Sequence, residues 1–155
     1  MINERSLLII EVLAIELEPP LVLEGSCSVS GTIKSMRDRR LGYALITDED
    51  KLVGIFTERD VLLSVLDEDE VLQQPVSKLM TPTPVCVHAL DTVWRVVSLM
   101  HEGGFRQIPV VDEQQRVLSC VRHKDIADYL VNHFARHILN LPPDPEQLAT
   151  TPEGA

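Results

Sequence analysis

Residues 43–60 read YALITDEDKLVGIFTERD, and residues 107–125 read QIPVVDEQQRVLSCVRHKD. Both stretches contain an apolar run, an acidic turn, a second apolar run and a closing aspartate. A shift of 64 residues places Asp48 on Asp112, and one extra residue in the following turn places Asp60 on Asp125. Outward from these stretches the likeness extends over residues 20–60 and 84–125. Such self-similarity indicates two copies of one supersecondary unit that bury their apolar faces together. We therefore expect function at the cleft between the copies.

Each copy is predicted to run strand, helix, strand, strand, helix, which makes the chain an α+β protein. Two such units, packed sheet to sheet about a pseudo-two-fold axis, would share one core. In the first copy the expected strands are 21–23, 43–47 and 51–56, and the expected helices are 28–39 and 57–66. In the second copy the expected strands are 85–87, 106–111 and 117–121, and the expected helices are 91–102, with Asp91 as its cap, and 124–139.

The domain bounds follow from the same pattern. Residues 1–17 have mixed helical periodicity and are expected to form an N-terminal helical segment that stops before Pro19 and Pro20. The first repeat is expected to cover 18–67 and the second 76–139, with a linker over 68–75. Residues 140–155 hold four prolines and little apolar pattern, so a disordered tail is expected there.

Charge and cysteine content limit the classes of function. The formal net charge of −10 would repel nucleic acid and anionic lipid. The apolar N-terminal stretch is cut by Glu11 and Glu16, so no segment is expected to enter a membrane. Three cysteines without a CxxC pair encode neither a disulfide framework nor a zinc site, which favours a reducing cytoplasm. No phosphate-binding glycine loop or nucleophile–base spacing is present, so the chain is not predicted to be an enzyme.

Three stretches together resemble a known family: Met80-Thr81-Pro82, the strand from Arg106 to Asp112, and the sequence from Gly54 to Asp60. They are similar to the cystathionine-β-synthase (CBS) domain, in the tandem arrangement called a Bateman module. The resemblance covers about residues 12–139. It implies that the Gly-hydrophobic-x-Thr-x-x-Asp stretch binds adenine nucleotides and that modules pair through their helices as a homodimer.

Thr57 and Asp60 carry the candidate site of the first copy. Asp60 falls in the first turn of a predicted helix, where a carboxylate is electrostatically favoured, and it could hold both hydroxyls of a ribose. Thr57 could offer its hydroxyl to the sugar or the α-phosphate, beside the free N–H groups of the helix start. The resemblance implies that adenine lies against Val22, Tyr43 and Ala44. Thr57-x-x-Asp60 is equally the pattern of a capping box, in which both side chains only satisfy helix donors.

The second copy departs from this pattern. Arg122 stands at the threonine position and Ser119 at the glycine position, while Asp125 keeps the carboxylate. Arg122 either pairs with Asp125 and closes the site or reaches a phosphate through a charge-assisted contact. Cys86 occupies a first-strand position that the resemblance assigns to the nucleotide pocket, and the remaining candidates are Gln107 and Ile108.

The leading hypothesis is a regulatory module that binds AMP, ADP, ATP or S-adenosylmethionine in the cleft between the copies. Because no catalytic domain is present, its output would pass to a regulated partner protein that the sequence does not identify. The rival hypothesis is a protein-interaction scaffold with empty sites. Arg122 in place of threonine and Leu45 in place of the second copy's Pro109 favour this rival.

Overall fold

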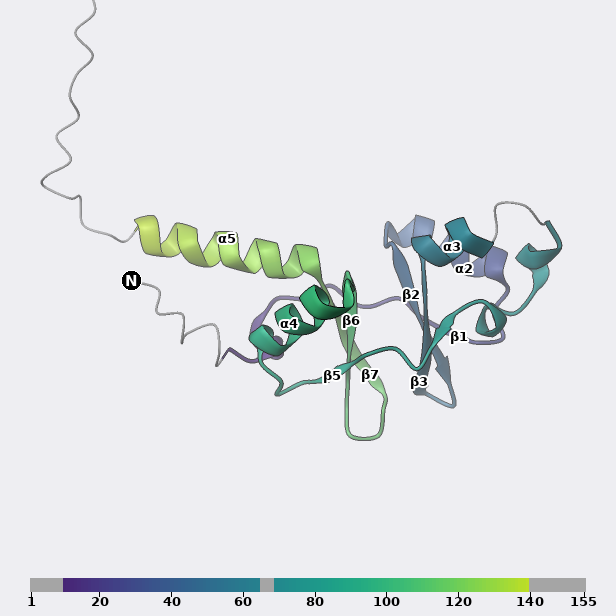
Figure 1. Cartoon of the computed structure of the whole chain (residues 1–155), viewed down its shortest axis with the longest axis horizontal. Helices are drawn as coiled ribbons and strands as arrows, with labels where there is room; N and C mark the ends of the chain where they lie inside the picture. Colours follow the sequence, from purple (N-terminus) through teal and green to yellow (C-terminus); the bar gives the residue numbers. More distant parts are fainter. Residues whose placement is uncertain (1–9, 65–68, 140–155) are drawn as a thin grey trace, which may run out of the picture.

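A computed structural model of the chain describes residues 10–64 and 69–139 (Figure 1). Its elements, in chain order, are η1 (Val12–Ala14), β1 (Val22–Glu24), α2 (Val29–Arg39), β2 (Tyr43–Asp48), β3 (Lys51–Thr57), α3 (Glu58–Ser64), η2 (Asp69–Gln73), η3 (Val76–Lys78), β4 (Thr81–Pro82), β5 (Val87–His88), α4 (Val93–Gly103), β6 (Gln107–Val111), β7 (Val117–Arg122) and α5 (His123–Leu139).

The strands form two sheets, ordered β1-β2-β3-β4 and β5-β6-β7. In each sheet the first strand pairs parallel with the second, which pairs antiparallel with the third. The registers match as well, because Tyr43 faces Thr57 in one sheet and Gln107 faces Arg122 in the other. Figure 1 shows α2 and α3 with the first sheet and α4 and α5 with the second. The predicted element order and the α+β class are confirmed.

A pseudo-two-fold relation between the halves is visible in the hairpins. Lys51 forms an isolated antiparallel bridge with Arg116, its own counterpart in the repeat. Next to it, the Leu52 N–H donates to the Gln115 carbonyl oxygen at 2.9 Å. Only residues close to a two-fold axis can pair with their own equivalents, so the axis passes between these turns.

The segments that precede each repeat are exchanged between the halves. The Val12 N–H donates to the Asp91 carbonyl at 2.9 Å, and the Val76 N–H donates to the Cys27 carbonyl at 2.8 Å. Val76 lies 64 residues after Val12, and Cys27 lies 64 residues before Asp91, so the two bonds are equivalent in the repeat. Val12 and Val76 are both fully buried. The segment before the first repeat therefore packs on the second half, and the segment that ends in β4 completes the first sheet.

Each half has its own apolar cluster, and the two clusters meet at β7. Cys120 of β7 packs into the first cluster, although the strand belongs to the second sheet. The burial of long apolar side chains supplies most of the stability of such a fold. The largest fully buried side chains are Tyr43, Phe56, Leu45, Ile46 and Ile108.

Capping residues explain where α2 and α4 begin and where α4 ends. Ser28 and Thr92 each accept a hydrogen bond from the main-chain N–H three residues further on, which caps α2 and α4. The expectation that Asp91 caps the second of these helices is wrong. Its carboxylate instead accepts from the His88 N–H at 2.8 Å and closes the preceding turn. Gly104 ends α4 in the left-handed region, with φ of 67°.

The structure differs from the expected elements in the N-terminal segment, at β4, which no expected strand covers, and at β5. In the described part of the N-terminal segment, from residue 10 onward, the helical element is the 3₁₀ turn η1 alone. The first strand of the second copy is Val87–His88 rather than 85–87. Residues 1–9 and the expected tail at 140–155 lie outside the described residues, and the repeat and linker bounds stay predictions. No helix within the described ranges has the length and apolar character needed to cross a membrane.

Candidate functional site

In the first copy, Thr57 and Asp60 form a reciprocal hydrogen-bonded pair where β3 passes into α3. The Thr57 N–H and the Thr57 hydroxyl both donate to Asp60 Oδ2 at 2.8 Å, and the Asp60 N–H donates to Thr57 Oγ1 at 3.4 Å. This is the geometry of a capping box. The other carboxylate oxygen, Oδ1, accepts only a long bond of 3.4 Å from the Thr81 hydroxyl. That oxygen is the weakly engaged acceptor of the cluster.

Thr81 reaches Asp60 because of a close approach next to Gly54. A Cβ added to Gly54 would lie 2.1 Å from Met80 Sδ, so a side chain at this position would displace Met80. Gly54 also faces Pro82 across the β3–β4 pair. The missing side chain therefore lets the segment after η3 lie flat on β3. The sequence pointed to Gly54 and Thr81 as family features but did not place Thr81 at the carboxylate.

The three residues expected to contact adenine differ in their exposure to solvent. Tyr43 and Ala44 are buried in the first apolar cluster, whereas Val22 is 39% exposed on β1. Burial, with Cys120 nearby, raises the pKa of the Tyr43 phenol well above its ordinary range. Burial likewise raises the pKa of the Cys120 thiol to about 12. A ligand role for Val22, Tyr43 and Ala44 stays a prediction.

In the second copy, Arg122 and Asp125 form a partly buried, bidentate ion pair. Arg122 Nε donates to Asp125 Oδ2 at 3.0 Å, and Nη2 donates to Oδ1 at 2.6 Å. The third nitrogen, Nη1, lies 3.2 Å from Glu18 Oε2. The side chains of Arg122 and Asp125 are 18% and 6% exposed, so the pair is shielded from water. Its hydrogen bonds to Asp125 raise the pKa of the Arg122 guanidinium. Of the two alternatives for Arg122, the structure contains the ion pair.

The remaining candidates of the second copy lie on neighbouring strands or just before them. Gln107 is half-buried and faces Arg122 across the β6–β7 pair, and Ile108 is fully buried. Cys86 is half-buried just ahead of β5, and burial raises the pKa of its thiol. A raised pKa keeps the thiol protonated and unreactive. Ligand contacts by these three residues stay predictions.

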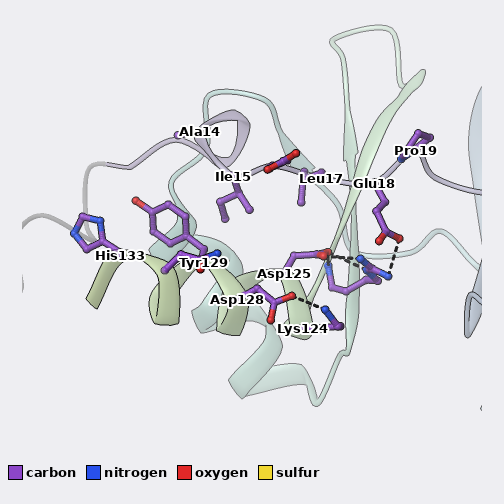
Figure 2. Close-up of a pocket in the computed structure, with 13 residues that line it drawn as sticks. Ala14, Ile15, Leu17, Glu18, Pro19, Lys124, Asp125, Asp128, Tyr129 and His133 are labelled. Carbon is purple, nitrogen blue, oxygen red and sulfur yellow. Dashed lines mark hydrogen bonds and ion pairs between the residues drawn. The ribbon is translucent and has the colours of Figure 1, made fainter. Parts of the chain in front are cut away.

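A cavity of about 600 Å³ lies between the N-terminal segment and α5 (Figure 2). The Arg122–Asp125–Glu18 cluster forms one end of it. Further along α5, the Tyr129 and His133 rings stack with their centroids 5.7 Å apart. The repeat gave no signal for Glu18, because the equivalent position in the second copy is Pro82. The lining is completed by Ala14, Ile15, Glu16, Leu17, Pro19, Lys124, Asp128 and Asn132.

A second cavity of about 600 Å³ lies on the helical face of the first half, between α2 and α3. Met36 and Val61 line it, and Leu62 and Leu63 beside it are 61% and 75% exposed. Across the described ranges 10–64 and 69–139, no group of three or more histidine, cysteine, aspartate or glutamate side chains is arranged to hold a metal ion.

The model of the CBS domain matches this chain twice, at residues 13–67 and 76–132. The chain belongs to the CBS domain family. A solved CBS domain pair, that of the protein MJ0100 in complex with 5′-methylthioadenosine and S-adenosyl-L-methionine, superposes with a TM-score of 0.72. It is 25% identical in sequence, and the match covers 81% of this chain and 98% of that one. The predicted family and tandem arrangement are confirmed.

One further relative is similar in sequence, and one further solved structure is similar in fold. The CBS domain-containing protein CBSCBSPB3 of Arabidopsis thaliana is 33% identical over 94 residues, which are 60% of this chain and 17% of that protein. The chain thus matches less than a fifth of that relative's length. A putative acetoin utilization protein from Vibrio cholerae has a TM-score of 0.75 at 18% identity, over 87% of this chain and 100% of that one, and shows the fold alone.

Proposed function

We propose that this CBS pair is a regulatory module, rather than an enzyme, that binds an adenosine-containing ligand at Asp60 in the cleft between its repeats. The observation that carries the proposal is the match to the MJ0100 domain pair, which was solved with 5′-methylthioadenosine and S-adenosyl-L-methionine. AMP, ADP and ATP belong to the same ligand class because they share the adenosine group.

The geometry of Asp60 supports this role. Its Oδ2 is held by two short bonds from Thr57, which fixes the carboxylate, while Oδ1 has only the 3.4 Å contact with Thr81. A ribose hydroxyl can replace the long bond from the Thr81 hydroxyl at Oδ1 with a shorter hydrogen bond to the same carboxylate oxygen. Asp60 can therefore cap the helix through Oδ2 and bind a ligand through Oδ1.

Regulation would follow from the exchanged segments. Thr81 lies in β4, near the start of the second repeat, so a ligand that displaces its hydroxyl changes a contact between that strand and α3. A ligand shifts a conformational equilibrium only through different affinities for the two states. We propose that this difference sets the relative orientation of the repeats, which a partner protein reads in the cytoplasm. The exposed Leu62 and Leu63 support a homodimer formed through the helical face.

Isothermal titration calorimetry with 5′-methylthioadenosine, S-adenosylmethionine, AMP and ATP tests the proposal. Asp60→Asn should weaken binding about tenfold to a hundredfold, the worth of hydrogen bonds to a charged group. Asp48→Asn is the matched control, because Asp48 is an exposed carboxylate in the β2–β3 turn. Equal affinity in the Asp60→Asn variant and the wild type would remove Asp60 from the site. Thermal unfolding of each variant reports any loss of the helix cap.

A scaffold without ligand is the second candidate. It is favoured by the partly buried Arg122–Asp125 pair, which occupies the carboxylate of the second copy. It is also favoured by the capping bonds of Asp60. Absence of binding of all four compounds at millimolar concentration, with the protein folded, would select the scaffold.

A further inference from the structure

The two repeats place their closing aspartates in the same main-chain setting. Asp60 Oδ2 accepts from the Thr57 N–H at 2.8 Å, and Asp125 Oδ2 accepts from the Arg122 N–H at 2.8 Å. The difference lies at the other oxygen. In the first copy Oδ1 has a 3.4 Å contact with a hydroxyl, and in the second copy it has a 2.6 Å bond from a guanidinium.

The guanidinium is held from two sides. Asp125 takes Nε and Nη2, and Glu18 faces Nη1 at 3.2 Å. Figure 2 shows the dashed contacts that join Glu18 and Asp125 to the guanidinium between them. Glu18 is 69% exposed and contributes little by itself, whereas the bond to Asp125 is shielded from water. Separating a shielded pair leaves an uncompensated buried charge, so the arginine is strongly retained.

Space for a ligand already adjoins this pair. The cavity of about 600 Å³ in Figure 2 is lined by both Arg122 and Asp125, and ligand pockets commonly measure roughly 300–1,000 Å³. The second copy therefore has a carboxylate in the required main-chain setting and an adjoining hollow. It lacks a free carboxylate oxygen.

We propose that the Arg122 guanidinium occupies the Asp125 carboxylate in place of a ligand. This limits each chain to one adenosine ligand, bound in the first copy. The inference rests on the proposed function for the identity of the ligand. Replacement of Arg122 by threonine, the residue of the first copy, frees Oδ1 of Asp125 and opens a second site. Arg122 is thus the residue that determines the stoichiometry of the module.

The test counts bound 5′-methylthioadenosine and AMP by equilibrium dialysis of wild-type protein and Arg122→Thr. The wild type is expected to bind one molecule of each per chain, and Arg122→Thr two. Glu18→Gln is the matched control, because it removes the exposed contact and leaves the Asp125 pair intact, so one molecule should still bind. If Arg122→Thr fails to fold, Arg122→Met, which keeps an apolar stem and has no hydrogen-bond donor, should show the same gain.

The outcomes separate this inference from the proposed function. Two molecules bound to the wild type, or no gain in the folded Arg122 variant, would overturn the inference. A loss of AMP but not of 5′-methylthioadenosine on removal of Arg122 would also overturn it, because the arginine would then be a phosphate contact. If the wild type binds nothing, the proposed function fails. In that case, binding of one molecule by the Arg122→Thr variant would still show that Arg122 blocks the second site.

Discussion

Replacement of Gly54 by alanine tests whether the close approach of Met80 organises the first site. The new Cβ would lie 2.1 Å from Met80 Sδ, 2.7 Å from Cγ and 3.0 Å from Cε. Ordinary contact begins near 3.4 Å, so the sulfur must retreat by about 1.3 Å from its 2.1 Å separation to reach it. Because Cγ is also too close, a rotation at the far end of the Met80 side chain cannot relieve the clash.

The cost combines three effects. Overpacking of a well-filled site typically costs about 1–3 kcal/mol. An off-rotamer methionine accounts for about 0.5–1.5 kcal/mol of that cost. Alanine also lowers the conformational entropy of the unfolded chain, which stabilises the folded state by about 0.4–1 kcal/mol. We therefore expect Gly54→Ala to lower the free energy of unfolding by about 1–2 kcal/mol.

Urea denaturation of a double-mutant cycle measures the effect. Met80→Ala removes all three clashing atoms, so Gly54→Ala should cost nothing further in that background, and the coupling energy should be about 1–2 kcal/mol. Affinity for the adenosine ligand should fall in Gly54→Ala, because Met80 carries Thr81 with it. Additive stability losses, or a Gly54→Ala protein as stable as the wild type, would refute the clash as the reason for this glycine.

Three further predictions concern stability. The Cys120 thiol, with a pKa of about 12 in the fold against 9.0 ordinarily, stays protonated while the unfolded chain ionises. The free energy of unfolding should therefore fall with rising pH, by about 1 kcal/mol between pH 8 and pH 10. Cys120→Ala should lack this part of the slope in urea melts, and an unchanged slope would contradict it. Ser28→Ala and Thr92→Ala, at equivalent caps, should each lower the free energy of unfolding by about 1 kcal/mol, and Thr92→Ser should not. Lys124→Met should leave the thermal midpoint unchanged, because both partners of the Lys124–Asp128 pair are exposed. A shift of several degrees would show that this pair is structural.

The fold could be predicted from the sequence wherever a repeat and a local pattern agreed. The central strands lie within one residue of expectation because their apolar runs end at turns with their own signals. The N-terminal segment was different. Val12 and Ile15 are buried in the cluster of the other half, so their spacing reflects packing rather than helical periodicity. The short strands β4 and β5 are also set by distant partners rather than by local sequence.

The candidate site could be predicted only within each local stretch. The reciprocal bonds of Thr57 and Asp60 follow from their spacing of three, and pairing was one of two alternatives for Arg122. Thr81 and Glu18 could not be found in this way. Thr81 reaches the Asp60 carboxylate, and Glu18 reaches the Arg122 guanidinium, each from a distant segment of the chain. The exchange of segments that brings them there leaves no local sequence signal.

The exchanged segments also make synthesis and folding interdependent. Val12 packs against the residues around Val93, which are synthesised about 4–16 s later at 5–20 residues per second. The first sheet likewise waits for Pro82 before its edge is covered. A gene cut at the border between the repeats would thus encode two fragments with open edges, each complementing the other. Each half of the chain therefore lacks, until the pair is complete, a packing segment that the other half supplies.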